Sequence, residues 1–278
     1  MSKIVISGYY GFANAGDEAM LTAIVKSLRK AEESVDLTVI SGNPQNTSTK
    51  HLVNSIHRFA PCKIYSALAN CDLLLSGGGS LLQDVTSKKS LLYYLAVILL
   101  GKMMNKKVML YAHGIGPIRS NVLRKITKMV CNKVDLITVR DTDSLDELRR
   151  LGVTDTKIKL TADAVLTLAQ ADKVQGFKLL QNFNLSKDKP IVAISVRNWG
   201  SDDKYLQEMA KAADMLSKEK TVQIALLPLQ YPADVVACKK LQKFMKAEAV
   251  ILDTAFDTEQ FLAIMGCFDL LVGMRLHA

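Results

Sequence analysis

Short apolar runs alternate with helical patterns along almost the whole chain, and this alternation constrains the fold more than any other feature. In the first half, the predicted strands are Ile4–Ser7, Leu37–Ser41, Leu73–Ser76, Val108–Ala112 and Leu136–Arg140. The predicted helices begin near Gly16, Ser90, Ser120 and Thr142. Alternation of this kind is typical of a parallel sheet covered by helices on both faces.

A second series of the same kind follows residues 170–176, a polar stretch that predicts a linker. Its predicted strands are Ile191–Val196, Gln223–Leu227, Val250–Leu252 and Leu270–Gly273. Its predicted helices are Asp203–Lys218, Ala233–Met245 and one that begins at Thr258. We therefore expect an α/β protein with two doubly wound, Rossmann-like domains, residues 1–169 and 177–278. No helix follows the last strand, so we expect the second domain to be incomplete at its C-terminus.

The charge balance indicates what kind of partner the protein binds. Lysine and arginine outnumber the acids 36 to 27 over 278 residues, which gives a net charge of +9 and favours anionic partners. The basic residues are scattered through predicted helices with acids between them, which argues against nucleic acid. The five cysteines have neither CxxC nor metal-ligand spacing, and no targeting segment precedes the first strand. We expect a cytoplasmic protein without a metal site.

The most hydrophobic stretch of the chain is Leu91–Leu100. It has about half of the roughly 20 residues that a transmembrane helix needs, so it predicts a buried core helix. The alternative is peripheral contact with an anionic membrane, because lysines flank the stretch on both sides. These are Lys88, Lys89, Lys102, Lys106 and Lys107.

The turn after the first strand excludes two common nucleotide sites. Gly11 and Gly16 have the separation of a phosphate loop, but Asp17 and Glu18 stand where that loop needs Lys and Ser or Thr. The GxGxxG spacing of a dinucleotide site is also missing. Asp17 either caps the helix, or accepts hydrogen bonds from sugar hydroxyls or acts as a base.

Several other strand ends carry residues that suit an anionic ligand, since this architecture binds ligands at the carboxyl ends of its strands. Gly78 and Gly79 lie in a glycine run that can form an anion nest. His113 follows one strand and is either an interior histidine or a ligand contact. Arg140 and Arg197 each end a strand, as salt-bridge partners or as anion ligands.

The last six residues place an arginine and a histidine directly after an apolar strand. Arg275 offers a planar, permanently charged fork to a carboxylate or phosphate. His277 can transfer a proton near neutral pH. These residues are either a solvated basic terminus or part of an active site.

Taken together, these segments resemble the polysaccharide pyruvyl transferases over nearly the whole chain, and most closely the branch that pyruvylates bacterial secondary cell-wall polysaccharide. The segments are Asn14-Ala15-Gly16-Asp17-Glu18-Ala19, Ser76-Gly77-Gly78-Gly79-Ser80, His113-Gly114-Ile115-Gly116-Pro117, Arg140-Asp141, Asp163-Ala164-Val165, Ser195-Val196-Arg197 and Arg275-Leu276-His277-Ala278. The resemblance implies phosphoenolpyruvate as donor, a pair of sugar hydroxyls as acceptor, no cofactor, and a fold similar to two-domain glycosyltransferases. In that family the Arg-Leu-His triplet contacts the donor, helped by an arginine of the first half.

On this basis we expect a pyruvyltransferase that forms a cyclic ketal on a lipid-linked amino-sugar oligosaccharide, in the cytoplasm or at the inner face of the plasma membrane. His277 is the expected general acid and Asp17 the base. The expected donor-binding residues are Arg140, Arg197, Arg275, Leu276, Gly78 and Gly79, and the expected acceptor-binding residues are Asn14, Asp17 and His113. The alternatives are a glycosyltransferase that uses a nucleotide sugar and a non-catalytic module that binds anionic glycans.

Overall fold

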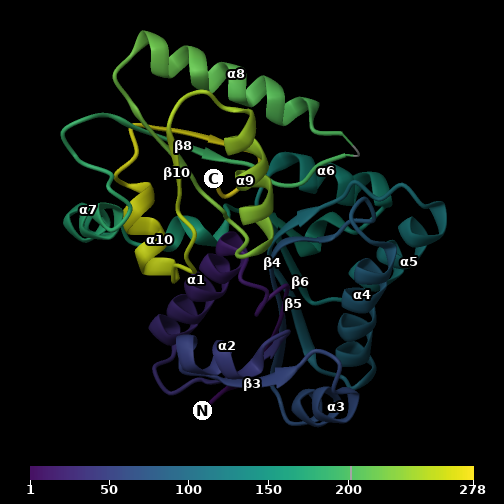
Figure 1. The fold of residues 1–278 in the computed structure, drawn as a ribbon. Helices are drawn as coiled ribbons and strands as arrows, with labels where there is room; N and C mark the ends of the chain where they lie inside the picture. Colours follow the sequence, from purple (N-terminus) through teal and green to yellow (C-terminus); the bar gives the residue numbers. More distant parts are fainter. Residues whose placement is uncertain (201) are drawn as a thin grey trace. The chain divides into compact units, whose positions relative to one another are not determined.

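A computed structural model describes residues 1–200 and 202–278. The chain divides into two compact units, which are described separately (Figure 1). Unit 1 comprises residues 1–12 and 17–168, and unit 2 comprises residues 13–16 and 169–278.

Unit 1, which is described in full, is built on a parallel sheet of seven strands in the order β3-β2-β1-β4-β5-β6-β7. The strands are β1 (Lys3–Ser7), β2 (Asp36–Ser41), β3 (Asn54–His57), β4 (Leu73–Leu82), β5 (Lys107–Ile115), β6 (Leu136–Val139) and β7 (Ile158–Leu160). The order reverses between β1 and β4, which makes their carboxyl ends the topological switch point. The five strands predicted for this half are confirmed, whereas β3 and β7 were not predicted.

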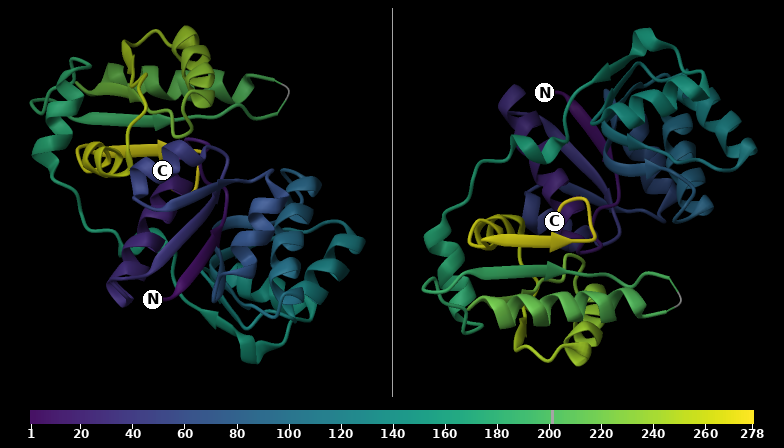
Figure 2. Two further views of the ribbon diagram at one scale, coloured as in Figure 1. Left: turned by 90° about the horizontal axis from the view of Figure 1, so that it is seen from below. Right: turned by 90° about the horizontal axis from the view of Figure 1, so that it is seen from above.

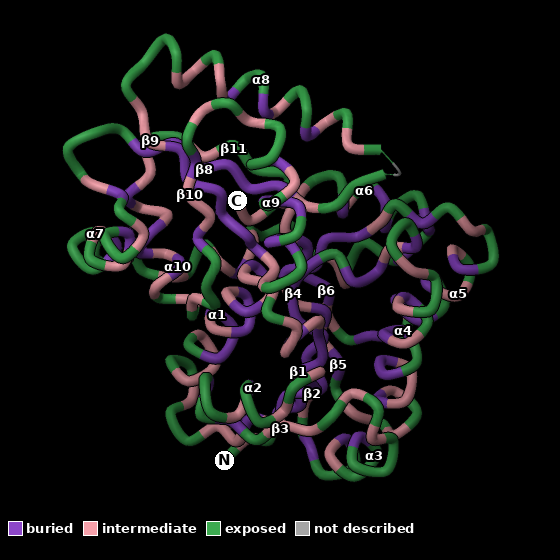
Figure 3. Tube along the Cα trace, viewed as in Figure 1, coloured by how far each residue is buried: buried purple, intermediate pink, exposed green. Residues whose placement is uncertain are grey.

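Helices cover both faces of this sheet, as the alternation predicts. The helices are α1 (Ala15–Ala31), α2 (Pro44–His51), α3 (Pro61–Ala69), α4 (Lys88–Met103), α5 (Asn121–Cys131) and α6 (Thr142–Leu151), with short 3-10 turns at Asp155–Lys157 and Ala164–Thr167. On β1, Val5 belongs to a core cluster that also contains residues of α3, α4, α5 and α6, whereas Ile4 and Ile6 belong to a second cluster that contains residues of α1. The strands are accordingly buried, and the outer sides of the helices are exposed (Figure 3).

The described residues of unit 2 form a four-stranded parallel sheet in the order β10-β9-β8-β11. The strands are β8 (Ile191–Ser195), β9 (Gln223–Leu226), β10 (Ala249–Ile251) and β11 (Leu270–Gly273), and the helices are α7 (Lys173–Gln181), α8 (Lys204–Glu219), α9 (Ala233–Phe244) and α10 (Thr258–Met265). Helices α8 and α9 pack on one face, α7 and α10 on the other. Figure 2 shows β11 (yellow) beside β8 (green). The predicted class, an α/β protein with two doubly wound units, is confirmed.

Two short segments lie differently from the sequence-based division. Residues 13–16 group with unit 2 because their backbone bonds to the segment after β9. Ala15 N–H donates to the Leu229 carbonyl at 2.8 Å, and Tyr231 N–H donates to the Ala13 carbonyl at 3.1 Å. Helix α7 begins at Lys173, so its first turn lies within the stretch predicted as a linker.

Helix α4 contains the most hydrophobic stretch of the chain. Leu91, Tyr94, Leu95 and Ile98 are buried in the core of unit 1, while Leu92 is exposed. The stretch therefore forms mainly a core helix, as the sequence predicts. Among the described residues, no helix is both long and apolar enough to cross a membrane.

Candidate functional site

In unit 2, the candidate residues follow two neighbouring strands. Gly273 at the end of β11 pairs with Ser195 at the end of β8, and Met274 N–H donates to the Ser195 carbonyl at 3.1 Å. Arg197 and Arg275 each lie two residues beyond these paired ends. Because the two strands are parallel and in register, Arg197 and Arg275 lie at the same edge of the sheet although they are far apart in the sequence. This is the edge at which proteins of this fold bind ligands.

Arg275 forms a bidentate ion pair with Asp234, an acid in the first turn of α9. Arg275 Nε donates to Asp234 Oδ2 and Nη2 to Oδ1, both at 2.7 Å, and Nη2 also donates to Gln230 Oε1 at 3.0 Å. The Asp234 side chain is only 3% exposed and accepts a further bond from Gln230 N–H at 2.9 Å. The guanidinium plane is thus held by a buried carboxylate that accepts three hydrogen bonds.

This ion pair limits how Arg275 can bind an anion. Of the five N–H groups of an arginine, three are used by Asp234 and Gln230 within the described residues, which leaves those of Nη1. The planar fork expected for the donor is therefore occupied by Asp234 in this structure. No sequence signal marks Asp234 as a partner of Arg275, because an acid in the first turn of a helix is ordinarily stabilised by the helix dipole alone.

His277 lies against the start of α1. A Cβ added to Gly16 would collide with the His277 ring, with Nδ1 as the closest atom. The neighbouring Asn14 forms an isolated antiparallel bridge with Gln230, the residue that also bonds Arg275. Unit 2 therefore brings together Asn14, Arg275 and His277, three of the predicted site residues. Leu276, between the last two, is 69% exposed.

Arg197 is placed differently from the other two predicted arginines. Its guanidinium lies 5.1 Å from the centre of the exposed Trp199 ring, and no carboxylate among the described residues pairs with it. The Arg197 carbonyl accepts a hydrogen bond from Tyr205 Oη at 2.7 Å, which fixes the backbone there. Arg197 thus has the charge most available to an anion at this edge.

In unit 1, Gly78 and Gly79 lie in β4 close to Asp17. Both have positive φ, +26° and +81°, which L side chains rarely adopt. A Cβ on Gly79 would lie 3.3 Å from Asp17 Oδ1, and one on Gly78 would lie 2.6 Å from Met20 Sδ. The structure therefore brings the predicted glycines and Asp17 together, and α1 approaches β4 closely only because these positions lack side chains.

Arg140 is held among polar groups at the same edge of the unit 1 sheet. Its side chain is 9% exposed and donates to Asp163 at 3.0 Å, Asp141 at 3.3 Å and Ser80 Oγ at 2.9 Å. Burial opposes ionisation of Asp141, but hydrogen bonds from Ser144 and the charge of Arg140 lower its pKa. Arg140, Asp141 and Ser80 line a polar cavity of about 300 Å³. Like Arg275, Arg140 is already paired with carboxylates.

His113 is fully buried in β5. Its Nε2 lies 3.1 Å from Ser76 Oγ and 3.0 Å from the Ser76 carbonyl, while Nδ1 has no hydrogen-bond partner among the described residues. Burial, together with the charge of Arg140, lowers the pKa of His113 to about 4, so the ring is neutral at physiological pH. With a side chain that is 0% exposed, His113 presents no ring surface to a sugar in this structure.

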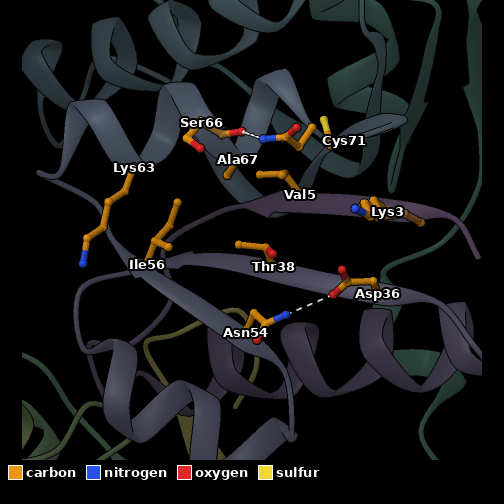
Figure 4. Close-up of a pocket in the computed structure, with 12 residues that line it drawn as sticks. Lys3, Val5, Asp36, Thr38, Asn54, Ile56, Lys63, Ser66, Ala67 and Cys71 are labelled. Atoms are coloured by element: carbon orange, nitrogen blue, oxygen red, sulfur yellow. Dashed lines mark hydrogen bonds between the residues drawn. The ribbon is translucent and has the colours of Figure 1, made fainter.

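A second cavity of unit 1, of about 350 Å³, contains none of the predicted site residues (Figure 4). It lies between α3 and the amino-terminal halves of β1, β2 and β3, where Asn54 donates to Asp36 at 3.0 Å. Ligands of doubly wound sheets bind beyond the carboxyl ends of the strands. This cavity is therefore not the candidate site.

The chain is similar to known proteins in sequence. The polysaccharide pyruvyl transferase family matches residues 14–278. The amylovoran biosynthesis protein AmsJ of Erwinia amylovora is 23% identical over 334 aligned positions, which cover 99% of this chain and 79% of AmsJ.

Solved structures are similar in fold. A complex of S. aureus MnaA with UDP superposes with a TM-score of 0.69 at 13% identity, over 99% of this chain and 74% of MnaA. A complex of Anabaena HepE with UDP-glucose superposes with a TM-score of 0.62 at 15% identity, over 98% of this chain and 73% of HepE. At such identities the likeness concerns the fold alone.

Proposed function

Because the chain belongs to the polysaccharide pyruvyl transferase family, we propose that it transfers pyruvate from phosphoenolpyruvate to two hydroxyls of a sugar, as a cyclic ketal. The proposed acceptor is a lipid-linked amino-sugar oligosaccharide, a precursor of a cell-wall polysaccharide. The observation that carries the proposal is the pair Arg275 and His277 at the end of β11, with Arg275 oriented by the buried Asp234.

The proposed reaction has a simple balance. A proton is added to the methylene carbon of phosphoenolpyruvate, which becomes a methyl group. Two acceptor oxygens bond to the central carbon as their O–H bonds break, and the bond from that carbon to the phosphate oxygen breaks with its electron pair on the departing phosphate. Of the two hydroxyl protons released, one balances the proton added to the methylene carbon and the other leaves with the phosphate. The chemistry needs an acid, a base for the hydroxyls and cations for the carboxylate and phosphate.

In unit 2, His277 is the proposed acid. The proposed donor contacts are Arg197, Leu276 and the Nη1 group of Arg275. Two cations at neighbouring strand ends suit a substrate with both a carboxylate and a phosphate. The bond between Asp234 and Arg275 supports this role, because a fixed guanidinium loses less side-chain entropy when it binds an anion.

In unit 1, Asp17 is the proposed base or acceptor contact, and Gly78 and Gly79 lie next to it. Asn14 and His113 are the other proposed acceptor residues. For His113 the role requires the buried ring to become exposed, so we propose it only as support beneath the site. Arg140 is the proposed donor arginine of this unit, where Asp141 and Asp163 hold it in place.

The test is release of inorganic phosphate from phosphoenolpyruvate by the purified protein, with lipid-linked amino-sugar oligosaccharides as acceptors. We expect release that depends on the acceptor and a product heavier by one pyruvate ketal, identified by mass spectrometry. A nucleotide-sugar panel is the control, because MnaA and HepE were solved with UDP or UDP-glucose. Sugar transfer from a nucleotide donor, without phosphate release from phosphoenolpyruvate, would replace this proposal with a glycosyltransferase.

A further inference from the structure

Arg58 is a cation at the edge of the unit 1 sheet where ligands of this fold bind. It directly follows β3, and its N–H donates to the Ser41 carbonyl at the end of β2 at 2.9 Å. All strands of this sheet are parallel, so Arg58 lies on the same edge as the loop after β1. No sequence motif marks this arginine.

The guanidinium of Arg58 is surrounded by aromatic rings instead of carboxylates. Its central carbon lies 5.3 Å from the centre of Phe12, 5.0 Å from Phe59 and 4.6 Å from Tyr93. Tyr93 Oη also donates to the Arg58 carbonyl at 3.1 Å. Among the described residues, no acid pairs with Arg58, in contrast to Arg140. Aromatic rings attract the charge of a guanidinium but offer no carboxylate oxygens to its N–H groups, so these groups can still bind an anion.

Several polar groups in this region lack partners. Arg58 Nε is buried without a hydrogen-bond partner among the described residues, and so is the hydroxyl of Tyr94. Tyr94 is 1% exposed, and its ring lies 5.2 Å from that of Tyr93. Buried donors without partners are rare in folded proteins, and an ion bound beside them is one of the explanations for such groups.

The aromatic surface beside Arg58 is open on one side. Phe59 is 71% exposed, and its ring lies 6.4 Å from that of Tyr93. Tyr9 stacks on Phe12 at 4.3 Å, with an interplanar angle of 12°. A ligand that fits here has an anionic group for the N–H edge of Arg58 and a ring with an apolar face for the exposed side of Phe59.

We propose that Arg58 binds the phosphate of a glycosyl phosphate, whose sugar ring packs on Phe59. The identification of this ligand with the acceptor rests on the proposed function, because a lipid-linked sugar carries a phosphate next to its first ring. The proposal that a phosphate binds here does not depend on that function, because it follows from the position of Arg58 among the rings of Phe12, Phe59 and Tyr93. Arg58 thus binds the acceptor by its phosphate, at a distance from the hydroxyls that react.

Calorimetry with N-acetylglucosamine 1-phosphate tests the site directly. Arg58→Lys keeps the charge and loses the planar fork, so we expect at least about a tenfold loss of affinity. Phe59→Ala removes an exposed ring at little risk to folding, and we expect a loss of about threefold or more. Arg149→Lys, an exposed arginine of α6, is the matched control and keeps wild-type affinity. N-acetylglucosamine and inorganic phosphate, each alone, bind at least tenfold more weakly than the ester.

Calorimetry tests the proposed binding site at Arg58, whereas phosphate release tests the proposed reaction. Unchanged affinity in both Arg58→Lys and Phe59→Ala overturns the site, even if Arg58→Lys lowers the melting temperature. Inorganic phosphate that binds as tightly as the ester overturns the sugar contact. In steady-state assays, Arg58→Lys should raise the KM of the acceptor and leave that of phosphoenolpyruvate unchanged. If the protein releases no phosphate, the proposed function fails, while the calorimetric result still decides the site.

Discussion

Arg275 and Arg140 show how much the role of a single residue depends on its partners. Each lies one or two residues beyond the end of a strand, where the sequence predicts an anion ligand, yet each is bound to carboxylates. A buried carboxylate beside an arginine fixes its orientation and cancels much of its charge. Among the described residues, Arg197 and Arg58 lie at these edges without a carboxylate partner, and both lie beside aromatic rings.

Removal of Arg275 should affect both donor binding and stability. We expect Arg275→Ala to weaken phosphoenolpyruvate binding by about 2 kcal/mol or more and to lower the free energy of unfolding by about 3–5 kcal/mol, because Asp234 is left buried and unpaired. Arg275→Lys should restore each only in part, since an ammonium cannot form the bidentate pair. Calorimetry and urea denaturation measure the two effects separately. Unchanged donor affinity in both variants would remove Arg275 from the donor site.

His277 should act mainly in proton transfer. We expect His277→Gln to lower turnover by about 10²–10⁴-fold and to leave the affinity for phosphoenolpyruvate within a few-fold of wild type. The measurement is kcat and KM for the donor, with calorimetry for binding. A change confined to KM, with turnover intact, would assign His277 to substrate binding instead.

The buried His113 should make stability depend on pH. Its pKa is about 4 in the folded protein and about 6.5 when unfolded, so between these values the unfolded state binds more protons. The stabilisation is present above pH 6.5 and is lost as the pH falls toward 4, by roughly 3 kcal/mol in total.

Urea denaturation at pH 5 and pH 7.5 measures this effect. In His113→Leu, the part of the pH dependence that His113 contributes should be absent, whereas the exposed His57→Asn control should keep the wild-type dependence. Equal pH dependence in wild type and His113→Leu would show that the ring is not buried in its neutral form.

At the scale of elements, the first turn of α1 connects the candidate residues of unit 2. Ala15 and Gly16 begin this helix, and their neighbour Asn14 bonds to the segment after β9. Gly16 is close to His277 because it has no side chain. The helix start therefore positions the histidine through a close backbone approach.

The substitution Gly16→Ala should lower turnover without lowering the stability of the protein. Alanine favours a helix over glycine by about 1 kcal/mol, but its Cβ would push the His277 ring away. We expect a melting temperature near that of wild type and turnover lowered at least about tenfold. Gly266→Ala is the control, since its Cβ would meet atoms only at 3.5 Å or beyond. Wild-type turnover in Gly16→Ala would show that this contact does not position His277.

At the scale of the whole molecule, the net charge of +9 leads to a prediction about membranes, where the proposed lipid-linked acceptor would lie. Near an anionic leaflet, a surface lysine contributes about 1 kcal/mol, and salt screens this attraction. We expect the protein to sediment with anionic liposomes at low salt and to detach at high salt.

Uncharged liposomes are the control for this experiment, and they should not bind the protein. No binding to anionic vesicles at low salt would contradict the charge argument. Binding that persists at high salt would instead indicate insertion of apolar residues, and the exposed Leu92 of α4 would be the first to test.

The sequence by itself determined the fold class and the family. Buried strands read as continuous apolar runs and helices as 3.6-residue patterns, and both signals are local. The sequence also indicated an unusual backbone conformation at Gly78 and Gly79, because backbone with positive φ favours glycine. The strands β3 and β7 were not predicted because they are only four and three residues long, too short to show an apolar run, and only one residue of β3 is apolar.

Only the tertiary structure decided which partners each candidate residue has. Asp234 lies 41 positions from Arg275, and Phe12 and Tyr93 reach Arg58 from separate segments. Residues 13–16 join unit 2 through hydrogen bonds to a loop more than two hundred residues away. Periodicity reports which face of an element is apolar, whereas the pairing of side chains at a sheet edge depends on strand order and register. Strand order and register follow from the packing of the whole chain, so the apolar pattern of a single segment does not predict them.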